Sequence, residues 1–246
     1  IRRQRQMCIR DSYYPGINYP SFNLSFANYN RKSGQESIGN ENQSTSWISA
    51  DVLEPYCNGN PDPNRWEVIK SKLGFDLKPW KNNGNYILIC CQRDGGWSMD
   101  NQPLLPWVVR TIQEIRKYSD RTVVVRFHPG DKNQLEHKRS IARYRLPNVR
   151  VSNADSIMQD LAQAHCLVNH NSSPGVVAAI EGVPVFLTDP ARSQAGAVAH
   201  TNFADIENVT HFDRQPWIEK MAMMHWSLDE LKDGTAWKHL RQWAVI

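Results

Sequence analysis

The sequence predicts an α/β fold, a Rossmann-like doubly wound parallel sheet, from three observations. Short apolar runs of strand length alternate with helical stretches between residues 86 and 190. The runs are apolar throughout, which is typical of parallel strands that are covered on both faces. Each run ends in a loop rich in Gly, Pro, Ser or Asn, residues that favour turns. Such alternation predicts βαβ units in one sheet.

The individual elements follow from length and pattern. Five runs are predicted strands: Tyr86–Cys91, Thr122–His128, Val149–Val151, Cys166–His170 and Pro184–Thr188. Four intervening stretches are predicted helices: Pro103–Tyr118, Lys132–Arg143, Ser156–Ala164 and Pro174–Glu181. Because each strand is followed by a helix and then by another strand, we expect parallel neighbours joined by helical crossovers.

Further helices are predicted on both sides of this core. Asn64 opens a short helix that ends near Gly74. The stretch Arg214–Trp226 carries Trp217, Ile218, Met221 and Met224 at helical spacing, and these side chains are expected to be core. Ser227–Glu230 is a capping-box sequence that starts another helix, interrupted at Gly234. The sheet is therefore expected to be followed by C-terminal helices.

Three segments are predicted along the chain: 1–12, 13–80 and 81–246. Residues 1–12 resemble a translated adapter sequence and are expected to be non-native, the alternative being an ordinary basic tail. Residues 13–80 are rich in Asn, Ser, Gly and Pro and are expected to be a short remnant of an N-terminal domain. The turn cluster Asn58–Pro63 is the best candidate boundary within the chain.

The composition is globular, with 40% hydrophobic and 22% charged residues, which excludes collagen, coiled coil and wholesale disorder. The most apolar stretch, Pro174–Leu187, is interrupted by Glu181 and Gly182, so no membrane span is expected. A net charge of +4 suits phosphate-bearing ligands without requiring a nucleic acid.

The cysteines favour a reduced, metal-free protein. Their number is odd, at five, and three of them fall inside predicted buried strands. There is no C-x-x-C motif and no His/Cys pair at metal-ligand spacing. We therefore expect free core thiols, no metal and, as the default, a cytoplasmic protein of a bacterium or phage-infected host.

Ligands of open parallel sheets bind at the carboxyl ends of the strands, so the loops that leave the strands there are the candidate sites. After the first strand come Arg93, Gly95 and Gly96. Paired glycines let backbone N–H groups approach a phosphate, and the Arg93 guanidinium can bind two of its oxygens. A tight turn with a solvated arginine is the equally weighted alternative.

His128 stands at the end of the second strand, followed by Pro129. A histidine there can donate to a phosphate or a sugar hydroxyl at neutral pH. Alone, such a residue is more often structural, but its position beside the other loops favours a binding role. His128 and Arg93 are the candidates for a catalytic role; the sequence does not identify a catalytic base.

The third loop is the most specific. Asn171, Ser172 and Ser173 lead from a strand into a helix that starts with Pro174. Hydroxyls and backbone N–H groups at a helix N-terminus form an anion site, although an ordinary capped helix has the same residues. Glu181, about two turns further on, is a carboxylate that can accept hydrogen bonds from both hydroxyls of a ribose.

These motifs together carry a family resemblance. His128-Pro129, Ser172-Ser173, Glu181-Gly182-Val183-Pro184 and Thr188-Asp189-Pro190 resemble the donor-binding half of GT-B glycosyltransferases, nearest in style to the capsule-polysaccharide branch. The resemblance covers residues 86–190. It implies that His128, Ser172 and Ser173 hold the nucleotide phosphates and Glu181 the ribose, and that residues 13–80 belong to an incomplete acceptor-side domain.

The leading functional hypothesis is metal-independent glycosyl transfer from a nucleotide-sugar donor, with no other cofactor. The acceptor would be a glycan or, from a weaker similarity to proteins encoded near phage DNA-modification genes, a hydroxymethylated DNA base. Arg93, His128 and the two serines would stabilise the leaving phosphate electrostatically. Two alternatives stay open: a nucleotide-sugar 2-epimerase, which needs no acceptor, and a non-catalytic nucleotide- or nucleic-acid-binding module.

Overall fold

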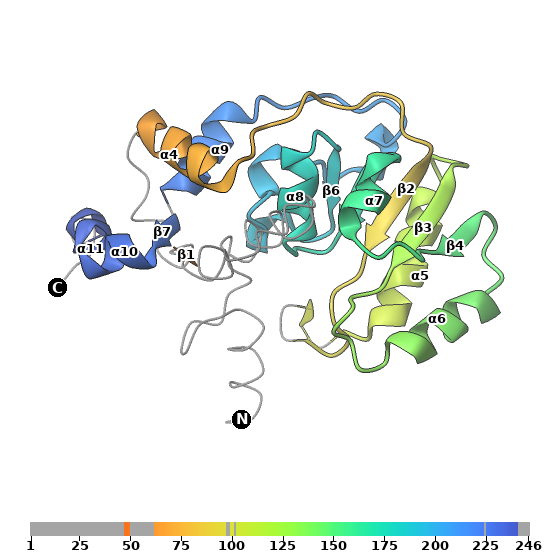
Figure 1. Cartoon of the computed structure of the whole chain (residues 1–246). Helices are drawn as coiled ribbons and strands as arrows, with labels where there is room; N and C mark the ends of the chain where they lie inside the picture. Colours follow the sequence, from red (N-terminus) through yellow and green to blue (C-terminus); the bar gives the residue numbers. More distant parts are fainter. Residues whose placement is uncertain (1–46, 50–61, 97–98, 101, 224, 241–246) are drawn as a thin grey trace. The chain divides into compact units, whose positions relative to one another are not determined.

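The computed structural model describes residues 47–49, 62–96, 99–100, 102–223 and 225–240, and it contains a five-stranded, wholly parallel sheet. Its strands are β2 (Tyr86–Cys90), β3 (Thr122–Arg126), β4 (Val149–Val151), β5 (Ala164–Asn169) and β6 (Val185–Leu187). They lie in the order β4-β3-β2-β5-β6 (Figure 1). This is a doubly wound order, so the predicted Rossmann-like fold is confirmed.

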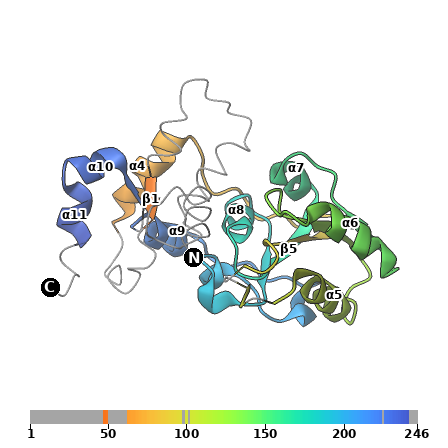
Figure 2. The same cartoon turned by 90° about the horizontal axis from the view of Figure 1, so that it is seen from below.

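Helices cover both faces of the sheet, as the continuous apolar strands require. They are α5 (Leu104–Ile115), α6 (Gln134–Arg143), α7 (Ile157–Ala162) and α8 (Pro174–Ile180). Right-handed crossovers place α5 and α6 on one face and α7 and α8 on the other, because the strand order reverses after β4. Figure 2 shows α5 and α8 on opposite sides of β5.

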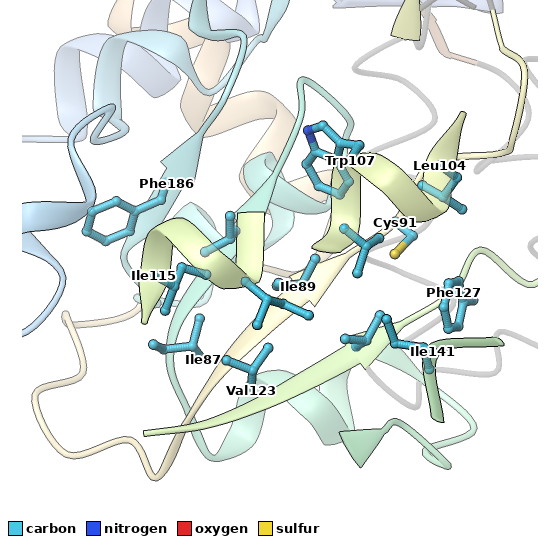
Figure 3. Packing of buried hydrophobic residues seen from close by; sticks show 14 of the residues in the cluster. Ile87, Ile89, Cys91, Leu104, Trp107, Ile115, Val123, Phe127, Ile141 and Phe186 are labelled. Carbon is cyan, nitrogen blue, oxygen red and sulfur yellow. The ribbon is translucent and has the colours of Figure 1, made fainter. Parts of the chain in front are cut away.

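The core beneath α5 explains why the strand pattern has no polar alternation. Ile87 and Ile89 of β2 and Val123 of β3 pack there with Ile115 of α5 and with Trp107, as Figure 3 shows. Leu88, between the two isoleucines, is also fully buried, and successive side chains of a strand point to opposite faces. Both faces of β2 are therefore apolar.

The chain divides into two compact units. One comprises residues 77–212 and contains the parallel sheet; the other comprises 1–76 together with 213–246. The second unit includes α4 (Pro63–Leu73), α9 (Gln215–Ala222), α10 (Leu228–Lys232) and α11 (Thr235–Leu240). The predicted segments 13–80 and 81–246 stay a prediction. The expected tail 1–12, and 13–46 with 50–61, lie outside the described residues.

The flanking helices are mostly as expected. α4 ends at Gly74, whose φ of 68° allows the left-handed cap, and helix resumes after Gly234 as predicted. The predicted helix Arg214–Trp226 is wrong at its end, since α9 stops at Ala222 and β7 (His225–Ser227) follows. β7 pairs antiparallel with β1 (Trp47–Ser49), a partner remote in sequence that the helical spacing could not reveal.

The described residues also include three of the five cysteines. Cys90, Cys91 and Cys166 are buried free thiols, as predicted, whereas Cys8 and Cys57 lie outside the described residues. Burial raises the pKa of the Cys91 and Cys166 thiols, so both are protonated at neutral pH. Among the described helices, none has the length and apolar character that crossing a membrane requires.

Candidate functional site

The loops that carry most of the predicted site residues meet at the carboxyl edge of the sheet. β2 and β5 are neighbours in the sheet, but the chain leaves β2 toward β3 and α5, and leaves β5 toward β6 and α8. Because the two connections run to opposite faces, their loops diverge at this edge, and such switch points are where doubly wound sheets bind ligands. The candidate site therefore lies at the ends of β2 and β5.

Arg93 and His128 are brought together on one side of this point. The Arg93 Nη2 atom and the His128 ring both lie 3.3 Å from where a side chain on Gly130 would begin. A side chain at position 130 would therefore press against both Arg93 and His128. The backbone N–H of Gly130 donates to His128 Nδ1 at 2.9 Å, which places the proton of the neutral ring on Nε2.

The glycine pair after Arg93 forms a tight turn. Gly95 has a φ of 64° and no atom within 4 Å of the place of a side chain. The Gly96 carbonyl accepts from the backbone N–H of Met99 at 3.0 Å. The positive φ of Gly95 therefore explains a glycine in this turn without a ligand. A ligand role for Gly95 and Gly96 stays a prediction.

A hydrogen-bonded network joins the ends of β2, β5 and β6. Gln92, directly after β2, donates from Nε2 to Asn171 Oδ1 at 2.9 Å and accepts from the Asn171 N–H at 3.4 Å. Asn171 Nδ2 donates to Asp189 Oδ2 at 2.8 Å. Gln92 and Asn171 are both buried, so these bonds fix the two diverging loops relative to each other. Asn171, a predicted site residue, is thus held in place at the switch point.

The network ends in an arginine held by two carboxylates. Arg192 lies in the short 3₁₀ helix Pro190–Arg192 after β6 and donates from Nε to Asp189 Oδ2 at 2.5 Å. Its two terminal nitrogens donate to the two carboxylate oxygens of Asp100 at 2.8 and 2.6 Å. Hydrogen bonding to Arg192 lowers the pKa of Asp100, which keeps this carboxylate ionised.

His170 is buried between β5 and the loop after β6. Its Nδ1 lies 2.7 Å from Thr188 Oγ1, which also accepts from Trp107 Nε1 at 3.2 Å. His170 Nε2 is buried without a hydrogen-bond partner, 3.8 Å from Asp189 Oδ2. Burial lowers the pKa of His170 more than the Asp189 charge raises it, so the ring is neutral at pH 7.

The helix N-terminus after β5 differs from the expectation. The N–H groups of Gly175 and Val176 donate to the carbonyls of Ser172 and Ser173, so they are used inside the turn. Ser173 makes no capping bond, and α8 has only seven residues. Because few free N–H groups and a short helix dipole remain, anion binding by the Ser172 and Ser173 hydroxyls stays a prediction that the helix N-terminus does little to support. Both serines are half-buried at the carboxyl edge.

Glu181 is not brought to the other candidates. It is the C-terminal cap of α8, whereas Ser173 is the N-terminal cap, so the two lie at opposite ends of the helix. The Glu181 side chain is 5% exposed and pairs with Lys78 Nζ at 2.8 Å. The backbone N–H groups of Lys78 and Lys81 donate to the carbonyls of Ile180 and Gly182 and cover this end. The structure therefore places Glu181 at the amino edge of the sheet, away from a ribose bound at the carboxyl edge.

Two carboxylates near the site support loops. Asp94 Oδ1 accepts from the first N–H of α5, on Leu104, at 2.8 Å. Asp131 is buried and accepts from the N–H groups of Asp94 and Asn133. The described residues contain no group of three or more His, Cys, Asp or Glu side chains that could hold a metal ion.

Sequence reasoning missed four contributors to the site: Gln92, Asp100, His170 and Arg192. Two of them carried a signal, because Gln92 and His170 are polar residues at the ends of apolar strand runs. A buried polar side chain at a strand end needs a partner, which points to a network. Asp100 and Arg192 had no such signal, since their pairing joins loops 92 residues apart.

No protein-family model matches the chain, and no curated protein matches it. Among solved structures, it is similar to the β-Kdo 2,7 transferase KpsC of Thermosulfurimonas dismutans, with a TM-score of 0.46, 12% identity, and 78% of this chain and 65% of that chain covered. It is also similar to the UDP-GlcNAc 2-epimerase of Methanocaldococcus jannaschii, with a TM-score of 0.39 and 12% identity; 70% of this chain and 52% of that chain are covered. The similarity to the wall teichoic acid polymerase TagF has a TM-score of 0.34 and 13% identity; 78% of this chain and 49% of that chain are covered. The chain therefore spans less than two thirds of the length of each.

Proposed function

We propose that the parallel-sheet unit binds a nucleotide-sugar donor at the carboxyl ends of β2, β3 and β5, and that the protein transfers the sugar as a GT-B-type glycosyltransferase. The convergence of Arg93 and His128 around Gly130, next to the β2/β5 switch point, carries this proposal. A guanidinium and an imidazole side by side suit the phosphates of a nucleotide diphosphate. The strand order supports it, because nucleotides bind to such sheets at this place.

The chemistry proposed for these residues is stabilisation of the leaving group. Breaking the bond between the sugar and the nucleotide leaves negative charge on the phosphate oxygens. Arg93 carries a permanent positive charge, and His128 presents its Nε2 proton, so both can donate to those oxygens. The Ser172 and Ser173 hydroxyls add neutral donors across the switch point. Donors fixed before the reaction cost no reorganisation as charge develops.

A panel of UDP, GDP, CDP, CMP and TDP, measured by thermal shift and titration calorimetry, tests donor binding. One nucleotide is expected to stabilise the chain, and Arg93→Ala or His128→Ala should weaken its binding about tenfold or more, the value of one charge-assisted hydrogen bond. The matched control is Arg139→Ala, which removes an exposed arginine of α6. Equal affinity in the wild type and both site variants would overturn the assigned site.

A panel of the corresponding sugar nucleotides separates transfer from the other functions. A transferase releases nucleotide faster when an acceptor is added, and a glycan and a duplex containing hydroxymethylated bases are the two acceptors to compare. An epimerase converts the donor with no acceptor present. A binding module turns over no donor, and DNA binding by such a module would weaken steeply with salt.

A further inference from the structure

We propose that Arg192 is a second phosphate-binding residue of the donor site, and that Asp100 occupies the place of the phosphate while no donor is bound. This inference rests on the proposed function and adds a residue and a competing carboxylate to its site. Arg192 and Asp100 come from the loops after β6 and β2, which flank the end of β5. Their contact therefore joins the loops on the two sides of the β5 end, where the switch point lies.

The geometry of the contact is that of anion recognition. Both terminal nitrogens of Arg192 bind both oxygens of Asp100, the paired arrangement in which guanidinium groups also bind phosphate. The side chains of Arg192 and Asp100 are 41% and 59% exposed, so the pair stands in water. An exposed ion pair contributes little to stability and is readily exchanged for another anion.

Arg192 is nevertheless held in place when Asp100 is exchanged. Its Nε remains bound to Asp189, and Asp189 is fixed by Asn171 and through it by Gln92. This inner part of the network is buried or half-buried, unlike the outer pair. The guanidinium is thus preorganised with one edge anchored and the other edge available to an anion that displaces Asp100.

A second feature of the same cluster points to a ligand. His170 Nε2, on a side chain that is 8% exposed, is directed at the Asp189 carboxylate yet lies 3.8 Å from it and has no partner. A buried polar atom without a partner is costly in either tautomer of the ring, so a ligand that supplies one is favoured here.

Side chains that can donate to a phosphate lie on both sides of β5 along this edge. Arg93 and His128 lie at the ends of β2 and β3, and Arg192 follows β6, on the other side of β5. A nucleotide diphosphate has two phosphates to be bound. Groups on both sides of the switch point can therefore bind one phosphate each.

Titration calorimetry with the nucleotide diphosphate that binds the wild type tests the inference. Asp100→Asn keeps the shape and tolerates the backbone φ of 51°, but it removes the competing charge. We expect it to tighten nucleotide binding about two- to fivefold, as an exposed ion pair predicts. Arg192→Lys keeps the charge but loses the paired geometry and should weaken binding about tenfold.

Glu114→Gln is the matched control, because it also removes one exposed carboxylate that is paired with a base: Glu114, on α5, pairs with Lys117. It should leave nucleotide affinity unchanged, which separates the local effect from the change in net charge. Nucleotide binding that is equal in the wild type, Asp100→Asn and Arg192→Lys would overturn this inference and leave the proposed function standing. Failure of every nucleotide to bind the wild type would instead overturn the proposed function, and with it the inference.

Discussion

The two ends of α8 hold charged and polar groups in opposite ways. At its N-terminal end, Ser172 and Ser173 are half-buried and lie at the carboxyl edge of the sheet. At its C-terminal end, Glu181 is buried, paired with Lys78 and covered by the segment that carries Lys78. The sequence motif contains both ends within ten residues, but the helix separates them.

Polar residues at the amino edge therefore serve stability, whereas those at the carboxyl edge are available for binding. A buried carboxylate that is paired with a lysine through one oxygen holds the chain in place and is covered from ligands at the other edge. Exposed pairs such as Asp100 with Arg192 can exchange partners. The comparison predicts that changes at the amino edge alter stability, whereas changes at the carboxyl edge alter ligand affinity.

The largest effect is expected from Gly182→Ala at the amino edge. Gly182 has a φ of 74°, and a side chain there would lie 2.0 Å from the Pro79 carbonyl oxygen. Because backbone must move to relieve this contact, the free energy of unfolding should fall by at least about 3 kcal/mol, measured by urea denaturation. Gly95→Ala is the control: its φ is similar but its surroundings are open, so about 1 kcal/mol is expected. Equal losses in the two variants would contradict the close approach at Gly182.

Lys78→Met should be the next most damaging change. It leaves the Glu181 carboxylate buried without its partner, which should lower the free energy of unfolding by about 3 kcal/mol. Lys117→Met removes a similarly short but exposed pair with Glu114 and should cost much less stability. Urea denaturation of both variants measures the contrast, and a Lys78→Met variant as stable as Lys117→Met would show that Glu181 is not held this way.

Nucleotide affinity should also respond differently to changes at the two edges of the sheet. Glu181→Gln should bind the stabilising nucleotide as the wild type does, because the carboxylate is at the far end of α8. Arg93→Ala should bind it about tenfold more weakly. Calorimetric titration of the two variants decides between the edges, and loss of affinity in Glu181→Gln would return the ribose role to Glu181.

The smallest effect is a pH dependence at the carboxyl edge. Burial lowers the pKa of His170 in the folded chain, so the unfolded chain takes up this proton first. The resulting stability is present above the unfolded pKa of about 6.5. It is lost as the pH falls through the folded value. His170→Gln should therefore lose less stability than the wild type between pH 7 and pH 5, as followed by urea denaturation at each pH. Parallel curves would show that His170 does not titrate in this way.

The sequence predicted the sheet well because burial on both faces leaves a signal that needs no knowledge of neighbours. Val149–Val151 was predicted with its observed bounds, and β2 to within one residue. Local pattern also located the loops after β2, β3 and β5. It failed for β7, because a three-residue strand acquires its conformation from β1, far away along the chain.

For the candidate site, sequence reasoning identified residue types but not their partners. Ser172 and Glu181 were grouped because a motif joins them, whereas a helix of α8's length holds its ends about 10 Å apart. Conversely, Asp100 and Arg192 are distant in sequence and meet only because β2 and β6 flank β5. Proximity of this kind follows from strand order, which a single sequence does not display.

The parallel-sheet unit also begins and ends at one place. Trp80, near its start, donates from Nε1 to the carbonyl of Phe212 at 3.0 Å and stacks on His211. The sheet unit is in this respect an insertion whose ends already touch. Once the sheet unit has folded, its two ends are held together. The entropic cost of closing the long loop between the two segments of the other unit is then already covered by the folding of the sheet unit. β1 and β7, which are far apart in the sequence, then pair across a shorter effective loop.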